Sequence, residues 1–514
     1  MIFHPSMRED VTVDAGDGRP ARRMLVAFAG RPVVIRRHGR VLSRGGESQQ
    51  APRLEVMSQA APTRVFEPAR YATFRVTGWT FDEPSATASL SYALDDELRF
   101  TERIELPAGA PPLEPARRAA LHAVLDLLHQ VAGVSYYKAA APEHVTVETG
   151  PLSERRARLL TDVYVQGLGE YAYRNGLDLA SRLRFAAGPG AADPSPTPLA
   201  PTGRSLVPIG GGKDSVVALE TMRAAGADVT LFSVGDPTAI GATSAISGLE
   251  RLVARRVIDP LLIRLNAEGA LNGHVPVTAV VSLIALATAV LHGLDEVVLA
   301  NERSASQGNL EHAGIEVNHQ WSKGVAFERG LRDVLAHEVS PDLGYFSVLR
   351  CASELAIARA FARLPAYHHA FTSCNATFRL DERRRAATWC RDCPKCRFVT
   401  LALAPFLAPA DVASIFGADL LDDPAQTPGF LALCGFEDHK PFECVGEREE
   451  SVAAFRLLAG DPRWADHAVV RAARERLLPA VPDDFGDPAT VLALSGDHEI
   501  PGRLMAAVHA RLGA

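Results

Sequence analysis

Apolar and polar residues alternate along two stretches in the first quarter of the chain, ATFRVTGWTFD (residues 72–82) and ATASLSYALDDELRFTERIEL (residues 86–106). Alternation with a period of two buries one face of a strand and exposes the other, so both stretches are predicted to form antiparallel hairpin strands. Asp95-Asp96 marks a turn within the second stretch. Residues 115–133 and 152–176 instead repeat apolar residues every three or four positions, which indicates helices.

The pattern changes after a segment rich in Pro, Ala and Gly, residues 186–203. This segment lacks the apolar content that a core needs, and we expect it to be a semi-extended tether. Beyond it, four short apolar runs are predicted as buried strands, and helical stretches begin near Asp214, Thr243 and Val277. The four runs are SLVPIG, DVTLFSVG, DPLLIRLN and DEVVLAN.

Repeated alternation of strand and helix predicts a parallel sheet with helices on its faces. Ligands of such sheets lie at the carboxyl ends of the strands, so we expect functional loops after Ile209, Val234, Leu265 and Leu299. The fold class is therefore α/β. The predicted organisation is an N-terminal α+β domain (1–185), the linker (186–203), an α/β catalytic domain (204–400) and a mostly helical region (401–514).

Composition narrows the class of protein. The chain has 514 residues, which suggests two or three domains, and its net charge of −7 argues against a surface devoted to nucleic acid. Its most apolar segment, residues 275–302, contains Pro276 and runs into the acidic pair Asp295-Glu296, so we interpret it as a buried helix followed by a strand. A membrane span is the less favoured alternative. No secretory signal is evident at the N-terminus, and a cytoplasmic enzyme is predicted.

A glycine-rich turn, PIGGGKDS (residues 208–215), joins the first strand of the α/β region to its helix. Bare backbone N–H groups beside a helix N-terminus favour an anion. Among the side chains, Ser215 offers a hydroxyl to a phosphate oxygen and Asp214 offers a carboxylate to Mg²⁺. The spacing matches neither the Walker pattern nor G-x-G-x-x-G, and a turn without a ligand is the plain alternative.

The same turn resembles the PP-loop of the ATP pyrophosphatases, S-G-G-x-D-S, with Gly210 in the place of the usual serine. The resemblance implies a HUP-like fold and an enzyme that splits ATP between its α and β phosphates and adenylates a substrate oxygen. It also implies a pyrophosphate cradle, and an adenosine contact near Ser233 after the second strand. Because the serine hydroxyl is missing, the pyrophosphate must be held by the backbone N–H groups or by Lys213. The implied ATP-binding residues are Gly210, Gly211, Gly212, Lys213, Asp214, Ser215 and Ser233.

Four of the seven cysteines crowd into one stretch: Cys374, Cys390, Cys393 and Cys396. Two C-x2-C steps with a distant fourth cysteine can close a tetrahedral thiolate site for Zn²⁺, and an iron–sulfur cluster has similar spacing. PP-loop synthases of the deazaguanine pathway have a similar arrangement around a structural zinc. A closed site leaves no position for substrate, so a structural role is predicted. Cys351, Cys434 and Cys444 are interpreted as small core residues.

The densest run of reactive side chains, residues 300–330, follows the fourth predicted strand and is called the polar segment below. A polar run at the carboxyl end of a strand is predicted to line the site. Its candidates for base, carboxylate clamp or metal ligand are Glu302, Arg303, Asn318, His319, Lys323 and Glu328.

Six further motifs stand in order behind GGGKDSVV: NERSASQGN, EVNHQWSK, YFSVLR, FTSCN, WCRDCPKC and KPFECVGE. Together, from Ile209 to Glu447, they resemble the MurL family, ATP-dependent UDP-N-acetylmuramoyl-L-alanyl-L-glutamate epimerases of peptidoglycan synthesis. The resemblance implies UDP-MurNAc-L-Ala-L-Glu as substrate, ATP, Mg²⁺ at Asp214, and no nucleic acid or membrane partner. It leaves the oligomeric state open. The candidates for α-proton transfer are His319 first, then Glu302, Lys323 and Cys444.

Two other functions stay open on the sequence alone. One is a PP-loop ligase or synthase that adenylates a carboxylate and passes it to nitrogen. The other is a zinc-bearing, tRNA-modifying or RNA-binding PP-loop protein, which needs a basic and aromatic face. The acidic balance and the 7% content of aromatic residues weigh against the second.

Overall fold

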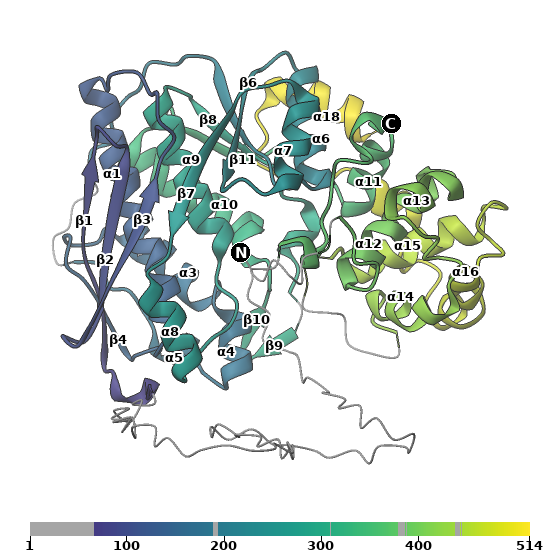
Figure 1. The fold of residues 1–514 in the computed structure, drawn as a ribbon, viewed down its shortest axis with the longest axis horizontal. Coiled ribbons are helices and arrows are strands. Elements are labelled where there is room, and N and C mark those ends of the chain that lie inside the picture. The colour runs from purple at the N-terminus through teal and green to yellow at the C-terminus, as the bar shows by residue number, and fades with distance from the viewer. Residues whose placement is uncertain are drawn as a thin grey trace, which may run out of the picture. The chain divides into compact units, whose positions relative to one another are not determined.

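The computed structural model describes residues 66–188, 194–308, 310–378, 386, 388–436, 443 and 445–513, and these residues belong to one compact unit. Nine of the described strands form a single mixed sheet in the order β11-β8-β5-β6-β7-β3-β2-β1-β4, and β9 pairs with β10 separately (Figure 1). The strands are β1 (Thr73–Asp82), β2 (Thr87–Leu94), β3 (Leu98–Glu105), β4 (His144–Val147), β5 (Arg204–Pro208), β6 (Asp228–Val234), β7 (Arg251–Val257), β8 (Glu296–Leu299), β9 (Leu310–His312), β10 (Ile315–Val317) and β11 (Gly344–Ser347).

Helices surround this sheet and form the region that follows it. They are α1 (Pro115–Ala132), α2 (Val134–Tyr137), α3 (Glu154–Val165), α4 (Gly169–Asn175), α5 (Leu179–Arg182), α6 (Lys213–Ala224), α7 (Thr238–Ser247), α8 (Pro260–Glu268), α9 (Val277–His292), α10 (Val325–Val334), α11 (Glu354–Ala362), α12 (Pro394–Leu403), α13 (Pro409–Phe416), α14 (Thr427–Leu433), α15 (Arg448–Ala459), α16 (Ala468–Ala472), α17 (Pro488–Leu492) and α18 (Met505–Leu512).

The predicted N-terminal hairpin strands are confirmed. β1 pairs antiparallel with β2, and β2 with β3, with Asp95 at a turn where its φ is +48°. One face of these strands is buried against α1, through residues such as Phe74, Leu90 and Phe100. The other face is partly exposed, which explains the alternating pattern.

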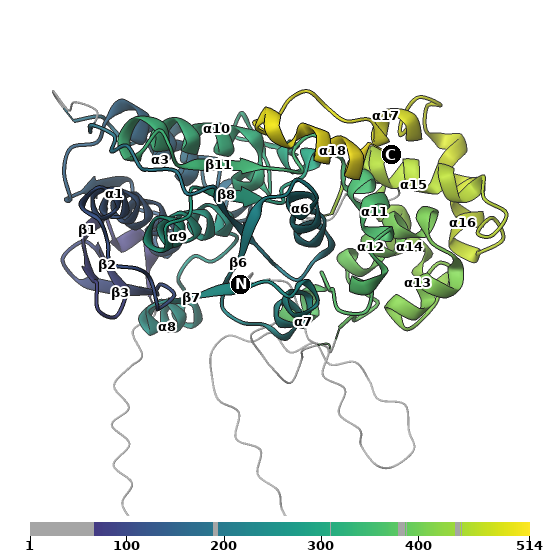
Figure 2. The ribbon, with the colours of Figure 1, turned by 90° about the horizontal axis from the view of Figure 1, so that it is seen from above.

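The next five strands pair in parallel in the spatial order β7-β6-β5-β8-β11, which is chain order three-two-one-four-five. Helices cover both faces: α9 packs on one side of β5 and β6, while α6 packs on the other (Figure 2). Neighbouring residues of one strand therefore belong to different cores, as Leu206 and Val207 do. This is the doubly wound arrangement, and its winding reverses between β5 and β8. Ligands of such sheets bind at that switch point.

One predicted strand is wrong. DPLLIRLN is helix α8, and the third parallel strand is the preceding β7. Pro260 occupies the first turn of α8, and the Asp259 carboxylate accepts a hydrogen bond from the Leu261 N–H at 2.8 Å. β7 has the sequence RLVARRV, and its three arginines break the apolar run expected of a central strand.

Two expectations for the rest of the chain are confirmed. Residues 277–299 form the buried helix α9 followed by β8, and none of the described helices has the length and apolar character to cross a membrane. From Leu401 onward, the described elements are helical. Within the predicted linker, Thr197 N–H donates to Val339 O at 2.8 Å, and Leu199 N–H to Asp342 Oδ2 at 2.9 Å. The domain boundaries stay a prediction.

A buried ion pair joins the antiparallel strands to the parallel ones. Glu102 on β3 accepts hydrogen bonds from Arg256 of β7, Nε at 2.7 Å and Nη2 at 3.2 Å. Arg256 Nη2 also donates to Ser135 Oγ at 2.9 Å. The Glu102 side chain is fully buried and that of Arg256 nearly so. Removing one charge would leave the other buried without its partner.

Substitution Glu102→Gln is therefore expected to lower the free energy of unfolding by about 3 kcal/mol. The matched control is Arg103→Gln, because Arg103 is the next residue of β3 and its side chain is 55% exposed. We expect that control to change stability by less than about 0.5 kcal/mol. Equilibrium urea denaturation followed by circular dichroism measures both variants. Equal stability of the Glu102 variant and the wild type would contradict this role.

Candidate functional site

The glycine loop, Gly210–Ser215, connects the carboxyl end of β5 to the first turn of α6 and lies at the switch point. Gly211 has a φ of +80°, and a Cβ there would lie 3.1 Å from the Ala239 carbonyl carbon. A Cβ on Gly212 would lie 2.9 Å from Ser373 Oγ, and the Gly211 carbonyl accepts a hydrogen bond from the Thr372 N–H at 2.9 Å. Because these glycines have no side chains, the segments that contain Ala239 and Thr372–Ser373 can lie directly against the loop.

Two serines of the predicted nucleotide site make local contacts. Ser215 Oγ accepts from the Gly210 N–H at 3.2 Å and donates to the Gly212 carbonyl at 3.0 Å, which fixes the loop conformation. Ser233, at the end of β6, donates to the Gly235 carbonyl at 2.9 Å and accepts from Arg251 Nη1 at 3.2 Å. Their predicted contacts with ATP stay predictions.

Lys213 does not point into solvent. Its side chain is 2% exposed and pairs with the carboxylates of Asp214 and Glu354. Burial alone would lower the pKa of Lys213, but the two carboxylates raise it above its ordinary value, so the ammonium is charged. Burial would likewise raise the pKa of Asp214, but Lys213, helped by Lys323 and Lys395, lowers it. Asp214 is therefore an ionised carboxylate with three cations near it.

Glu354 links the glycine loop to the helical region. It is the first residue of α11, and burial together with the Asp214 charge raises its pKa. Its backbone N–H donates to Glu450 Oε1 at 2.8 Å, and Ser304 of the polar segment donates to the same oxygen at 2.8 Å. Glu450 caps the N-terminus of α15. Helices α6, α11 and α15 thus begin close to the loop, and their dipoles favour an anion there.

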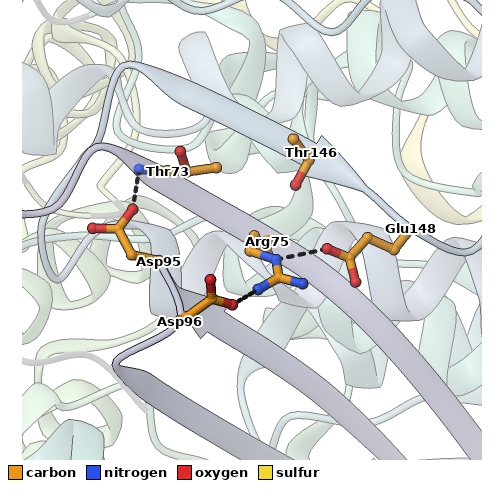
Figure 3. Close-up of a pocket in the computed structure, with 6 residues that line it drawn as sticks. All are labelled: Thr73, Arg75, Asp95, Asp96, Thr146 and Glu148. Carbon is orange, nitrogen blue, oxygen red and sulfur yellow. Dashed lines mark hydrogen bonds and ion pairs between the residues drawn. The ribbon is translucent and has the colours of Figure 1, made fainter.

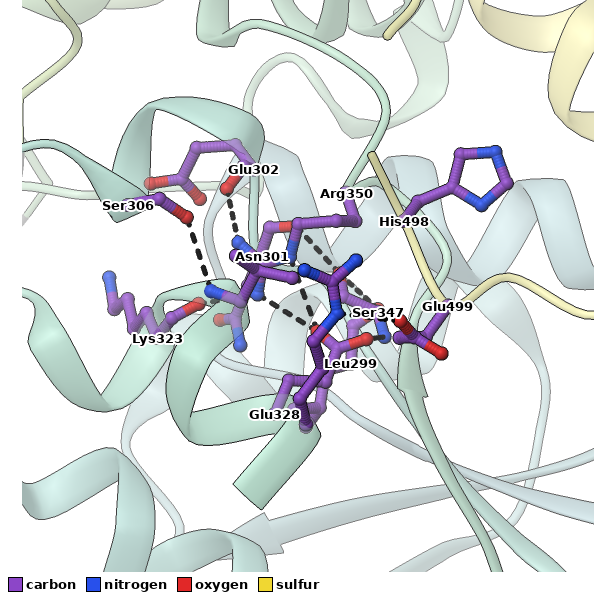
Figure 4. Close-up of polar contacts among 12 residues, drawn as sticks. Leu299, Asn301, Glu302, Ser306, Lys323, Glu328, Ser347, Arg350, His498 and Glu499 are labelled. Carbon is purple, nitrogen blue, oxygen red and sulfur yellow. Dashed lines mark hydrogen bonds and ion pairs between the residues drawn. The ribbon is translucent and has the colours of Figure 1, made fainter. Parts of the chain in front are cut away.

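The polar segment is held by one buried arginine (Figure 4). Arg350 is 1% exposed and donates to the Glu302 carbonyl at 2.6 Å, to the Lys323 carbonyl, and to Glu328 Oε2 at 2.9 Å. Burial raises the pKa of Glu328 although Arg350 opposes it. Glu328 and Arg350 therefore hold the segment in place. The candidate role of Glu328 in the reaction stays a prediction. Arg350 fixes the backbone at Glu302 and Lys323, which were both predicted as site residues.

Other candidates of the polar segment also have structural contacts. Asn318 Nδ2 donates to the Ala305 carbonyl at 2.8 Å, and its Oδ1 accepts from the Gln320 N–H at 2.7 Å. Arg303 donates to the Ala493 carbonyl at 3.2 Å. Lys323 Nζ donates to Gln320 Oε1 at 3.1 Å, and its charge acts on both Asp214 and His274 and lowers the pKa of each. Lys323 thus connects the glycine loop electrostatically to His274.

His319 lies in a second cluster, the histidine centre, made of Glu170, His274 and His319. Glu170 Oε2 contacts His319 Nδ1, and the rings of His274 and His319 are 4.2 Å apart between centroids. Burial would raise the pKa of Glu170, but the hydrogen bond from His319, together with the charge of its imidazole when protonated, lowers it to about 2. Burial, aided by His319, lowers the pKa of His274 to about 3, so its imidazole is neutral.

His319 was predicted from the sequence as a site residue, but Glu170 and His274 were not. Glu170 lies on α4, within a stretch interpreted only as an amphipathic helix, and His274 lies just before α9. The available signal was LNGHVPV, a polar turn with a histidine in front of an apolar helix. Glu302 is 4% exposed and close enough to Glu354 to raise the pKa of that carboxyl. Cys444 lies outside the described residues.

The four clustered cysteines converge on one point. Their sulfur atoms all lie within 4.8 Å of one another, with Cys390 and Cys393 Sγ at 3.8 and 3.5 Å from Cys396 Sγ. Tetrahedral Zn–S bonds of about 2.3 Å place sulfurs about 3.8 Å apart, so the cluster can hold a metal ion such as zinc. Backbone N–H groups of Cys390 and Cys393 donate to neighbouring sulfurs, which stabilises thiolates. Cys351 and Cys434 are buried, as predicted.

Two surface pockets lie elsewhere. One, of about 410 Å³, is lined by Arg75 of β1, by Asp95 and Asp96 of the turn between β2 and β3, and by Glu148 after β4 (Figure 3). Arg75 Nε donates to Glu148 at 2.6 Å and also pairs with Asp96, so the single cation of this pocket is shared between two carboxylates. The other, of about 330 Å³, contains the Arg156–Glu338 pair. Neither pocket includes a residue of the glycine loop or the histidine centre.

The fold and the site define a doubly wound α/β protein with a glycine loop at its switch point and a four-cysteine cluster. The chain belongs to the MurL family. The family model of the MurL N-terminal domain matches residues 65–348, and that of the MurL C-terminal domain matches residues 370–484. The resemblance seen in the sequence motifs is confirmed.

Three relatives are named UDP-N-acetyl-alpha-D-muramoyl-L-alanyl-L-glutamate epimerase. That of Micromonospora sp. is 50% identical, over 84% of this chain and 96% of its own. The Salinispora tropica protein is 51% identical, over 83% of this chain and 92% of its own. The Xanthomonas oryzae pv. oryzae protein is 43% identical, over 87% of this chain and 98% of its own. No solved structure matches the chain.

Substitution Cys396→Ala is expected to remove one equivalent of bound metal per chain, because three thiolates bind zinc more weakly than four. The matched control is Cys434→Ala, a buried thiol outside the cluster. Elemental analysis by mass spectrometry after exhaustive dialysis measures the metal. Retention of the full metal content by the Cys396 variant would contradict the assignment.

Proposed function

We propose that this protein epimerises the terminal L-glutamate of UDP-MurNAc-L-Ala-L-Glu to D-glutamate in peptidoglycan precursor synthesis, using ATP to activate the substrate. The observation that carries the proposal is the identity of 43–51% to proteins named for this epimerisation, over 92–98% of their length. The glycine loop at the switch point supports the use of a nucleotide.

Activation overcomes an electrostatic obstacle. Removing the α-proton beside a carboxylate would place a second negative charge next to the first. A carboxylate oxygen therefore attacks the α-phosphorus of ATP, the bond to the β-phosphate breaks, and pyrophosphate leaves. The acyl adenylate has lost the carboxylate charge and can delocalise a carbanion. The helix N-termini at the glycine loop, with Lys323 and Lys395, favour the leaving pyrophosphate.

Magnesium suits this loop because Asp214 is ionised and its side chain is 29% exposed. When bound, Mg²⁺ supplies charge neutralisation for the phosphate oxygens. Lys213 is turned inward, so the backbone N–H groups of the loop, more than this side chain, form the predicted cradle. We assign the four-cysteine cluster a structural zinc, which fixes Thr372, Ser373 and Lys395 around the loop.

Proton transfer follows activation. His319 takes the α-proton, the electron pair enters the activated carbonyl, and Lys323 returns a proton to the opposite face of Cα. Water then attacks the acyl carbon and releases AMP and the D-glutamyl product. Lys323 belongs to the same polar segment as His319 and acts electrostatically on Asp214 and His274, which supports a single site for both halves of the reaction.

Substitution Asp214→Ala is expected to reduce AMP formation and epimerisation together by at least 100-fold, because both depend on the loop. Substitution His319→Gln is expected to reduce epimerisation by a similar factor while AMP still forms. The assay combines ATP, Mg²⁺ and UDP-MurNAc-L-Ala-L-Glu, quantifies AMP, and determines glutamate chirality after acid hydrolysis. The control is Asp228→Ala, an exposed carboxylate at the opposite end of β6.

The wild-type reaction decides the function itself. Accumulation of D-glutamate with AMP supports the epimerase. Glutamate that stays entirely L would overturn the proposal, and a requirement for ammonia would point to the ligase alternative. Equal loss of AMP formation in the Asp214 and His319 variants would contradict the division between activation and proton transfer.

A further inference from the structure

The histidine centre is built into the interior and does not depend on a surface loop. Glu170 and His319 are each about 5% exposed. A Cβ at Gly167 would lie 2.3 Å from the Val163 carbonyl oxygen and 2.8 Å from Pro276 Cγ, and one at Gly273 would lie 3.1 Å from Tyr171 Cδ2. The start of α4 and the turn before α9 meet because both positions lack side chains. This close approach brings Glu170 to His274.

Two carboxylate oxygens of Glu170 have different partners. Oε2 contacts Nδ1 of His319, while Oε1 accepts a hydrogen bond from Arg174 Nε at 2.5 Å. The carboxylate is thus oriented on both sides, and the imidazole plane is fixed by it. Nδ1 of His319 donates to this carboxylate, so Nε2 is the ring nitrogen for proton exchange.

A divalent metal ion is a poor occupant of this centre, although two histidines and a carboxylate are common metal ligands. Arg174 pairs with Glu170, and the positive charge of Lys323 acts on His274. Both cations repel a metal ion and attract an anionic substrate. The same groups therefore favour a proton-transferring histidine beside a carboxylate-bearing substrate.

We infer that Glu170 is the positioning residue of His319 in α-proton transfer, an inference that rests on the proposed epimerisation. Glu170 fixes the tautomer of His319 and stabilises the imidazolium that forms when Nε2 takes the proton from Cα. The electron pair of the broken C–H bond moves into the carbonyl of the acyl adenylate. His274 packs against His319, with ring centroids 4.2 Å apart and ring planes at 41°.

The experiment compares wild type, Glu170→Gln and His312→Gln with ATP, Mg²⁺ and UDP-MurNAc-L-Ala-L-Glu in D₂O. Three quantities are measured: AMP formed, deuterium at the glutamate Cα by mass spectrometry, and the pH dependence of kcat. Gln at position 170 keeps the shape of Glu170 and removes its charge. His312 is the control because it belongs to the same polar segment but bonds the Leu177 carbonyl at 3.2 Å.

We expect Glu170→Gln to lose deuterium incorporation and epimerisation by at least 100-fold, with AMP formation within about threefold of wild type. Loss of the carboxylate charge removes the stabilisation of the imidazolium that forms on His319, so the acid limb of the kcat profile is expected to move to lower pH. His312→Gln is expected to behave as wild type.

Three outcomes would overturn the inference. The first is deuterium exchange at the wild-type rate in Glu170→Gln. The second is a parallel loss of AMP formation and exchange in that variant with an unshifted pH profile. The third is a dialysed wild type whose exchange requires added Zn²⁺ or Mn²⁺ bound through Glu170. Failure of the proposed function is distinguishable, because the wild type itself would then form neither AMP nor D-glutamate.

Discussion

The buried charge of Lys213 is the interaction on which the arrangement of the site depends. An ammonium that is 2% exposed is costly unless carboxylates surround it, and Asp214 and Glu354 do so. Glu354 opens α11, and its N–H group is held by Glu450 of α15, which also binds Ser304. Separating any of these segments would expose an unpaired charge. The sheet, the polar segment and the helical region are therefore held together directly beneath the glycine loop.

The doubly wound sheet explains why chemistry collects at this place. With a core on each face of β5 and β8, most side chains of both strands are used for packing, and the loops at their carboxyl ends present the polar groups of the site. The winding reverses between these two strands, and ligands of such sheets bind at that point. The glycine loop follows one strand and Glu302 follows the other. Arg350 then fixes the backbone of the polar segment.

Features encoded by neighbouring residues were predictable from the sequence. The hairpin strands, the glycine loop and the four cysteines each have a local pattern with a physical reason, and the structure brings the cysteines together as expected. β7 was not predicted because its arginines interrupt the apolar run expected of a buried strand. Their partners lie far away in the sequence, as Glu102 does from Arg256. Glu170 was missed because its partner His319 lies 149 residues away. Contacts of this kind depend on glycines that let distant segments approach closely, and no local spacing of residues predicts them.

The central claim is that a carboxylate of the substrate becomes an acyl adenylate before its α-proton is removed. Transfer of ¹⁸O tests it most directly, with UDP-MurNAc-L-Ala-L-Glu labelled in the α-carboxylate of glutamate and unlabelled ATP and water. Attack of that carboxylate on the α-phosphorus, followed by hydrolysis at the acyl carbon, predicts one ¹⁸O atom in each AMP released. Epimerised product accompanied by AMP that contains no ¹⁸O would contradict the account.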